Sequence, residues 1–125
     1  LYGAMEISKK TAKVGFEWNT FSEVWEKFVE EVEELKDAIN QKNKLHTANE
    51  LGDVLFTLTN IARWKKLDPE ECLARTNQKF LDRFSIIERS VNGKISENSL
   101  HELQQLWEVA KEELDEKVDD NDTIV

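Results

Sequence analysis

The sequence predicts an all-α protein, and three observations carry that prediction. Its 125 residues contain only four glycines and one proline, so few positions interrupt a helix. No segment shows the strict alternation of apolar and polar residues typical of strands, whereas apolar residues recur at helical spacing in long stretches. The connections between these stretches are short, which makes neighbouring helices antiparallel. We therefore expect an antiparallel helical bundle with about four main helices.

A short first helix is expected over residues 7–14, followed by an aromatic loop at residues 16–19. Thr20 and Glu23 then have the spacing of a capping box, in which side-chain oxygens satisfy free amides at a helix start. The helix that follows should end near residue 41. Apolar residues recur along it at steps of four and three and form one continuous seam. Its members are Phe21, Trp25, Phe28, Val32, Leu35 and Ile39.

The next helix is expected over residues 46–65, and its apolar stripe should be buried. The stripe consists of Leu51, Val54, Leu55, Leu58, Ile61 and Ala62. Asp68 and Pro69 suit the start of a third long helix, because Asp caps free amides and Pro fits the first turn. Ser99 begins a further capping box, for a final helix that should reach about residue 118.

The acidic residues outnumber the basic ones, and the imbalance is concentrated at one end. The formal net charge of −9 divides into about −1 over residues 1–96 and −8 over residues 97–125, which argues against nucleic-acid binding. We expect one domain over residues 1–118 and a disordered acidic tail at 119–125. The absence of a long apolar run or a secretory signal predicts a cytoplasmic protein that does not bind membranes.

Two predicted helices carry acidic residues beside their apolar stripes. At 100° per residue, Lys27, Glu31 and Glu34 share one flank of the first long helix. The corresponding flank of the next helix carries His46, Glu50, Asp53, Thr57 and Asn60. If the flanks face each other, four carboxylates converge, and such a cluster needs a hard divalent cation. Mg²⁺ is the natural candidate, because it prefers oxygen ligands and is commonly completed by substrate phosphates.

Acidic pairs three residues apart are also common on solvated helix surfaces. A non-catalytic helical oligomerisation module is therefore an open alternative at this point. A di-iron bundle is not favoured, because neither histidine has a glutamate three residues before it.

Several segments resemble the MazG family of all-α nucleoside triphosphate pyrophosphohydrolases. The acidic runs EEVEE at residues 30–34 and ELGD at residues 50–53 are similar to the family signature EExxE…ExxD. Four further segments resemble family motifs: VGFEW at 14–18, NIAR at 60–63, DPEE at 68–71 and NQKFLDRF at 77–84. The similarity covers about residues 11–88, and six ordered segments are a specific signal.

The resemblance implies Mg²⁺-dependent hydrolysis of a nucleoside triphosphate to the monophosphate and pyrophosphate, with Mn²⁺ as a possible substitute for Mg²⁺. It also implies a homodimer or higher homo-oligomer, which the expected apolar surface favours as well. By position, the metal ligands would be Glu31, Glu34, Glu50 and Asp53. The residues matching phosphate-contacting bases are Lys27, Lys79 and Arg83, and Trp107 matches an aromatic residue that contacts the nucleotide.

In such a reaction the cations would activate a water molecule for attack at the α-phosphorus. Glu34 and Glu50 are the candidate general bases, and helical phase does not choose between them. His46 stands where a basic residue is common in the family, and it would either contact phosphate or cap its helix. Phe16 and Trp18 are candidates for lining a nucleotide pocket. Narrower relatives, such as a dUTPase, a dCTPase or a phosphoribosyl-ATP pyrophosphohydrolase, are alternative assignments.

Overall fold

The computed structural model of the chain describes residues 1–115, which form helices and contain no strand. The predicted all-α class is therefore confirmed. The helices are α1 (Tyr2–Lys13), α2 (Phe21–Asn40), α3 (Lys44–Trp64), α4 (Pro69–Ser90), the 3₁₀ turn η1 (Ile95–Glu97) and α5 (Leu100–Asp115). The predicted helix end near residue 118 and the predicted acidic tail lie outside the described residues.

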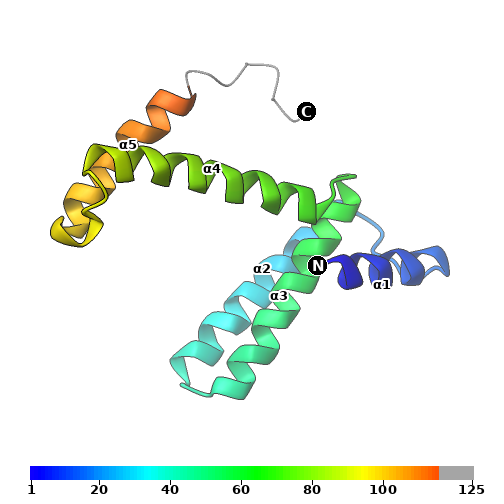
Figure 1. Ribbon diagram of the computed structural model, residues 1–125. Helices are drawn as coiled ribbons and strands as arrows, with labels where there is room; N and C mark the ends of the chain where they lie inside the picture. The colour runs from blue at the N-terminus through cyan, green and yellow to red at the C-terminus, as the bar shows by residue number, and fades with distance from the viewer. Residues whose placement is uncertain (116–125) are drawn as a thin grey trace. The chain divides into compact units, whose positions relative to one another are not determined.

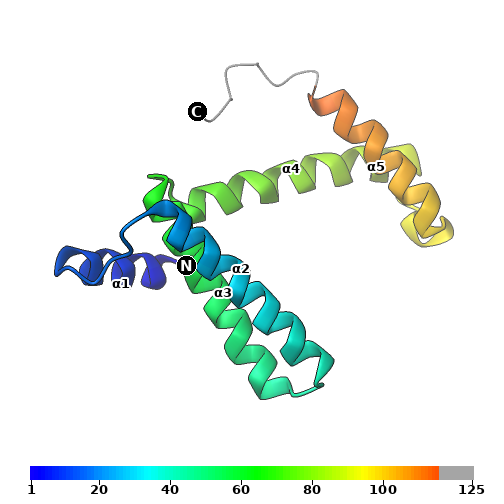
Figure 2. The same cartoon turned by 180° about the vertical axis from the view of Figure 1, so that it is seen from behind.

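Two compact units make up the chain, Leu1–Leu73 and Ala74–Val125, and the boundary between them falls inside α4. In the first unit, α2 and α3 lie side by side and antiparallel, joined by residues 41–43 (Figures 1 and 2). Helix α1 packs on α3. The short connection thus gives the antiparallel pair that the sequence predicts.

Local side-chain caps fix the starts of the long helices. The hydroxyl of Thr20 accepts a hydrogen bond from the backbone N–H of Glu23 at 3.3 Å, as the capping box predicts. Asn43 caps α3 and Ser99 caps α5 in the same way. Helix α1 begins at Tyr2, five residues before the predicted start. Packing explains the difference, because Met5 and Ser8 are buried and this burial extends the helix beyond its sequence signal.

The apolar seam that the sequence indicates on α2 is only partly buried within the chain. The buried positions are Val24, Glu31 and Ala38, each seven residues from the next, whereas Trp25 and Val32 are exposed. At 100° per residue, the buried face lies about 80° from the centre of the seam. Helix α2 therefore turns its acidic flank inward and leaves much of its apolar seam outside.

The predicted buried stripe of α3 was wrong in part. Leu51, Leu55 and Leu58 are exposed, and the buried residues of this helix are Thr57 and Thr59. Both threonine hydroxyls donate to backbone carbonyls one turn earlier, at 2.8 and 2.9 Å, so their burial leaves no hydroxyl without a partner. The first unit consequently exposes leucine side chains along α3.

Contacts between side chains of α4 and α5 hold the second unit together. The rings of Phe80 and Trp107 lie 4.9 Å apart, and Ile87 and Ala110 are buried. Aromatic pairs at this spacing stabilise the packing of two helices. Within residues 1–115, no helix is both long enough and apolar enough to cross a lipid bilayer.

Candidate metal centre and adjoining cavity

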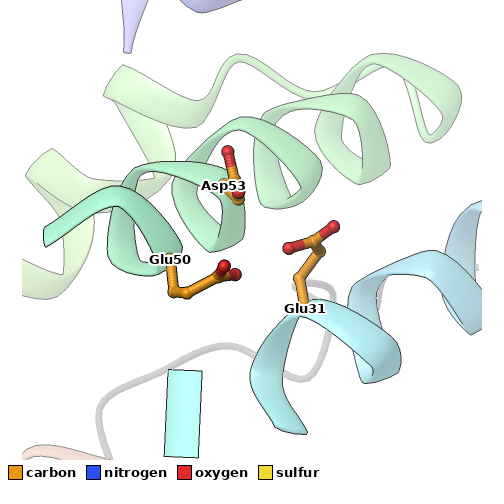
Figure 3. A group of neighbouring side chains, drawn as sticks. All are labelled: Glu31, Glu50 and Asp53. Atoms are coloured by element: carbon orange, nitrogen blue, oxygen red, sulfur yellow. The ribbon is translucent and has the colours of Figure 1, made fainter. Parts of the chain in front are cut away.

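Three carboxylates from α2 and α3 point toward one small space. Glu31 comes from α2, and Glu50 and Asp53 come from adjacent positions on one face of α3 (Figure 3). One oxygen from each lies within 4.8 Å of the others. Since α2 turns its acidic flank toward α3, Glu31 is only 6% exposed. The two acidic flanks identified in the sequence therefore face each other.

The oxygens of this cluster fit a hard divalent cation. Oε2 of Glu31 and Oε2 of Glu50 are buried, and within residues 1–115 neither has a hydrogen-bond partner. Leaving a buried polar atom without a partner is costly, and for a charged group more so. A divalent cation of the Mg²⁺ type takes oxygen ligands and would satisfy both atoms. The donor set is thus chemically suited to such an ion.

Glu34, the fourth predicted ligand, adjoins the cluster. It lies on α2 three residues after Glu31 and is half-buried. The negative charge of Glu31 raises the pKa of the Glu34 carboxyl, and burial and Glu50 raise this pKa further. The structure therefore brings all four predicted acids together, although Glu34 is not among the three whose oxygens share the 4.8 Å space.

Each helix places a basic residue one turn before a clustered carboxylate. Lys27 Nζ lies 3.0 Å from Oε1 of Glu31, and this hydrogen bond raises the pKa of Lys27. His46 Nε2 lies 3.4 Å from Oε1 of Glu50, while the His46 backbone N–H donates to the cap of α3. His46 thus occupies the helix start and the edge of the acid cluster at once.

A cavity of about 550 Å³ opens beside the acid cluster within the first unit. Lys27, Glu31 and Asp53 form one part of its wall. Phe16 and Trp18, the loop aromatics that the sequence singles out, also line it, together with Phe56 of α3. Flat apolar side chains suit an aromatic ring, and the carboxylate corner would suit an anionic end once a divalent cation is held there.

Glu17 and Arg63 anchor the aromatic loop to α3, and sequence reasoning assigned neither a role. Arg63 Nη1 lies 2.5 Å from Oε2 of Glu17, and Nη2 donates to Oε1 at 2.7 Å. The indole N–H of Trp64 also donates to Oε1, at 3.1 Å. The two residues stand 46 positions apart, so no local spacing pairs them. Their only sequence signal is that each lies in a segment resembling a family motif.

We expect Glu17→Gln to lower the free energy of unfolding at pH 7 by roughly 1–2 kcal/mol, because it removes the negative charge from a partly exposed ion pair with Arg63. The hydrogen bond from Arg63 chiefly lowers the pKa of Glu17. A lowered carboxyl pKa gives a stabilisation that is complete above the unfolded pKa and disappears as the pH falls through the folded one. Urea unfolding at neutral and at acidic pH should therefore show a difference from wild type only at neutral pH. The exposed Glu26→Gln serves as control, and an equal effect at both pH values would contradict the prediction.

The remaining predicted residues belong to the second unit. Lys79 is exposed on α4. Arg83, one turn later, is half-buried, and its guanidinium carbon lies 5.6 Å from the ring centroid of Trp107 on α5. This spacing is that of a cation–π contact. Their contacts with nucleotide and phosphate stay predictions.

Residues 19–85 match the MazG nucleotide pyrophosphohydrolase domain family. The chain belongs to this family. The matched segment contains α2 and α3 with the whole acid cluster, as well as Lys79 and Arg83. Trp107 lies outside the MazG match, as do the cavity residues contributed by α1 and by residues 16–18 of the aromatic loop.

Curated relatives agree with the MazG assignment. The chain is 34% identical over 111 residues to the nucleoside triphosphate pyrophosphohydrolase/pyrophosphatase MazG of Thermotoga maritima, which covers 86% of the chain and 42% of that protein. It is 34% identical over 123 residues to the nucleoside triphosphate pyrophosphohydrolase of Escherichia coli K12, covering 92% and 46%. The uncharacterized protein YabN of Bacillus subtilis is 46% identical over 66 residues, covering 50% and 14%. The chain spans less than half the length of these MazG relatives.

Proposed function

We propose that the chain hydrolyses nucleoside triphosphates to the monophosphate and pyrophosphate in a Mg²⁺-dependent reaction. The observation that carries the proposal is the cluster of Glu31, Glu50 and Asp53, with buried unpartnered oxygens, at the edge of a cavity with aromatic walls. The Thermotoga and Escherichia relatives are named for this activity. Family membership makes the same reaction the best-supported one for this chain.

In this mechanism the chain positions charge rather than forming a covalent intermediate. Bound Mg²⁺ supplies neutralisation of phosphate charge and a water of lowered pKa. Glu31, Glu34, Glu50 and Asp53 would hold the metal at the corner of the cavity. The water oxygen bonds to the α-phosphorus, the bond from that phosphorus to the α–β bridging oxygen breaks, and pyrophosphate leaves with that oxygen. Glu34 and Glu50 are the two candidate acceptors of the water's proton.

The basic residues have complementary proposed roles. Lys27 forms an ion pair with Glu31 and stands where it can turn to a phosphate oxygen once a cation binds. His46, at the edge of the cluster, is a second candidate phosphate contact. Lys79 and Arg83 are proposed to hold phosphate oxygens and Trp107 to contact the nucleotide, as the family resemblance implies.

The test is pyrophosphate release from the eight common ribo- and deoxyribonucleoside triphosphates, with Mg²⁺, with Mn²⁺ and with a chelator. We expect metal-dependent release and stoichiometric nucleoside monophosphate. Release of orthophosphate instead would contradict the proposal. Activity confined to dUTP or dCTP would favour a narrower relative, and phosphoribosyl-ATP should be included for the same reason. No release from any of these nucleotides would favour the non-catalytic module.

We also propose that the first unit assembles with a second copy of the chain. Helices α2 and α3 together expose a run of large apolar side chains: Trp25, Val29, Val32, Ile39, Leu51, Leu55 and Leu58. The buried apolar residues of this unit are few and include Met5, Val24 and Ala38. Exposed apolar surface of this extent marks an interaction site, and a self-complementary helical pair suits a homodimer.

The oligomeric proposal predicts a dimeric mass in light scattering coupled to size exclusion. Val32→Gln combined with Leu55→Gln should shift the protein toward the monomer, because both side chains lie in the exposed apolar run. Glu33→Gln, on the outer face of α2, should leave the mass unchanged. A monomeric wild type at high protein concentration would contradict the proposal. A cytoplasmic location without nucleic-acid or membrane partners remains part of the proposal.

A further inference from the structure

Four polar side chains form a hydrogen-bonded chain across the wall of the cavity. It runs from Glu17 in the aromatic loop through Arg63 of α3 to Ser8 of α1, and ends at Asn60 of α3. All four line the cavity, and Ser8 is only 3% exposed. This row of hydrogen bonds therefore joins three segments of the first unit at the place where a ligand would bind.

The direction of these hydrogen bonds fixes the orientation of Asn60. A guanidinium can only donate, so Arg63 Nε donates to the hydroxyl oxygen of Ser8, at 2.6 Å. The Ser8 hydroxyl in turn donates a hydrogen bond to Oδ1 of Asn60. The acceptor end of the Asn60 amide is thus directed at Ser8. Within residues 1–115 the opposite end of the amide, the Nδ2 group with its two protons, makes no hydrogen bond and is left for a ligand.

Arg63 holds this hydrogen-bond arrangement in place through its charge and its fixed plane. Both carboxylate oxygens of Glu17 contact the guanidinium of Arg63, one at Nη1 and one at Nη2, and this pairing determines the plane of the guanidinium. An arginine stays protonated in proteins, so Arg63 always donates to Ser8 and never accepts from it. While the Ser8 hydroxyl donates to Oδ1 of Asn60, the Nδ2 donor of Asn60 stays on the side of the amide away from Ser8.

The position of Asn60 relative to the acid cluster suits the base of a nucleotide. Asp53 and Asn60 are seven residues apart on α3, so they share a face and stand about 10 Å apart along the axis. Both line the same cavity, with Phe56 between them in the sequence and Phe16 in the wall. A nucleotide with its phosphates at Asp53 would extend its ring past these aromatic side chains toward Asn60.

We propose that Asn60 is a specificity-determining residue whose Nδ2 group donates to an exocyclic carbonyl oxygen of the bound nucleobase. This inference rests on the proposed function, since it assumes a nucleotide in the cavity. The site then favours bases with an oxo group at the pairing edge, such as hypoxanthine or uracil. It disfavours bases with an amino group there, such as adenine or cytosine, because two donors would face each other. Ser8 acts through Asn60 as a positioning residue.

The test compares nucleotides that differ mainly at this exocyclic group, ITP with ATP and dUTP with dCTP. We expect wild-type kcat/KM to favour the oxo member of each pair by at least about tenfold. Asn60→Asp has the same shape and still accepts from Ser8, but its second atom accepts instead of donating. The preference should therefore fall at least about tenfold and reverse toward ATP and dCTP. Asn40→Asp, an exposed change at the end of α2, is the matched control and should keep the wild-type ratio.

Ser8→Ala tests the positioning role separately. Without the serine hydroxyl the Asn60 amide is free to turn over, so the oxo-to-amino ratio should approach unity even if turnover of the better nucleotide changes little. A role confined to stability would lower the melting temperature and leave that ratio unchanged. An unchanged ratio in Ser8→Ala would overturn the positioning role.

Equilibrium binding distinguishes failure of this inference from failure of the proposed function. Calorimetric titration with inosine and adenosine 5′-monophosphates in Mg²⁺ needs no turnover. The inference predicts tighter binding of the inosine nucleotide by wild type and the reverse by Asn60→Asp. Equal binding of the two nucleotides by both proteins would overturn the inference. If the protein showed the predicted binding preference but released no pyrophosphate, only the proposed reaction would be overturned, and the inference about Asn60 would stand.

Discussion

We expect the single substitutions Glu50→Gln and Asp53→Asn to lower pyrophosphate release by at least about 100-fold, because each removes a charge that the metal needs. Both residues lie on one face of α3 with oxygens within 4.8 Å of a Glu31 oxygen, so each should contribute directly to the same site. Neither substitution changes side-chain volume appreciably. Helix content measured by circular dichroism should therefore match that of wild type.

Glu33→Gln provides the matched control for these variants. Glu33 is an exposed acid on α2 close to the cluster in sequence, and it faces away from α3. We expect it to retain wild-type turnover, so a loss there would indicate a general effect of charge. Wild-type rates in both Glu50→Gln and Asp53→Asn would contradict the assignment and move the site elsewhere.

Mg²⁺ should stabilise the wild-type protein, and this is the second large effect that the structure predicts. The buried Oε2 atoms of Glu31 and Glu50 have no hydrogen-bond partner within residues 1–115, and the neighbouring carboxylate of Glu31 raises the pKa of Glu34. A cation that binds only the folded state increases the free energy of unfolding by about 2.7 kcal/mol at 100 times its dissociation constant. Thermal melting in MgCl₂, compared with NaCl of equal ionic strength, measures the effect.

The variants make the melting experiment specific. Glu31→Gln and Glu50→Gln should lose most of the Mg²⁺-dependent shift, whereas Glu33→Gln should keep it. Glu34→Gln separates the two candidate bases, since loss of turnover with the Mg²⁺ shift retained would assign proton transfer to Glu34. If Mg²⁺ caused no specific shift in the melting temperature of the wild type, the proposed metal site would be wrong.

The helices and the candidate ligands were predictable because their signals are local. A cap joins residues two or three positions apart, as at Thr20 and Glu23, so a short stretch of sequence contains the whole interaction. Helical periodicity likewise placed Glu31 and Glu34 on one flank and Glu50 and Asp53 on another. That these flanks face each other depended on which faces of α2 and α3 pack together, because an antiparallel pair can meet through other faces as well.

Which faces become buried was decided by the tertiary structure. The sequence favoured the apolar seam of α2, but the face packed on α3 centres on Val24, Glu31 and Ala38. Hydrophobic burial is non-directional, so an amphipathic pattern does not say which partner covers which part of a wide apolar surface. With α1 and α2 as its neighbours, α3 left Leu51, Leu55 and Leu58 outside.

The cavity wall depended most completely on the three-dimensional fold. Sequence reasoning identified Phe16 and Trp18 as pocket candidates from their place in a loop, but nothing in their neighbourhood pointed to Ser8 or Arg63. The sequence by itself determined the helices and the acids that lie on each, because those are set within a few residues along the chain. The tertiary structure alone decided that Glu17, Arg63, Ser8 and Asn60 would form one hydrogen-bonded chain, because side chains about fifty positions apart meet only when helices pack.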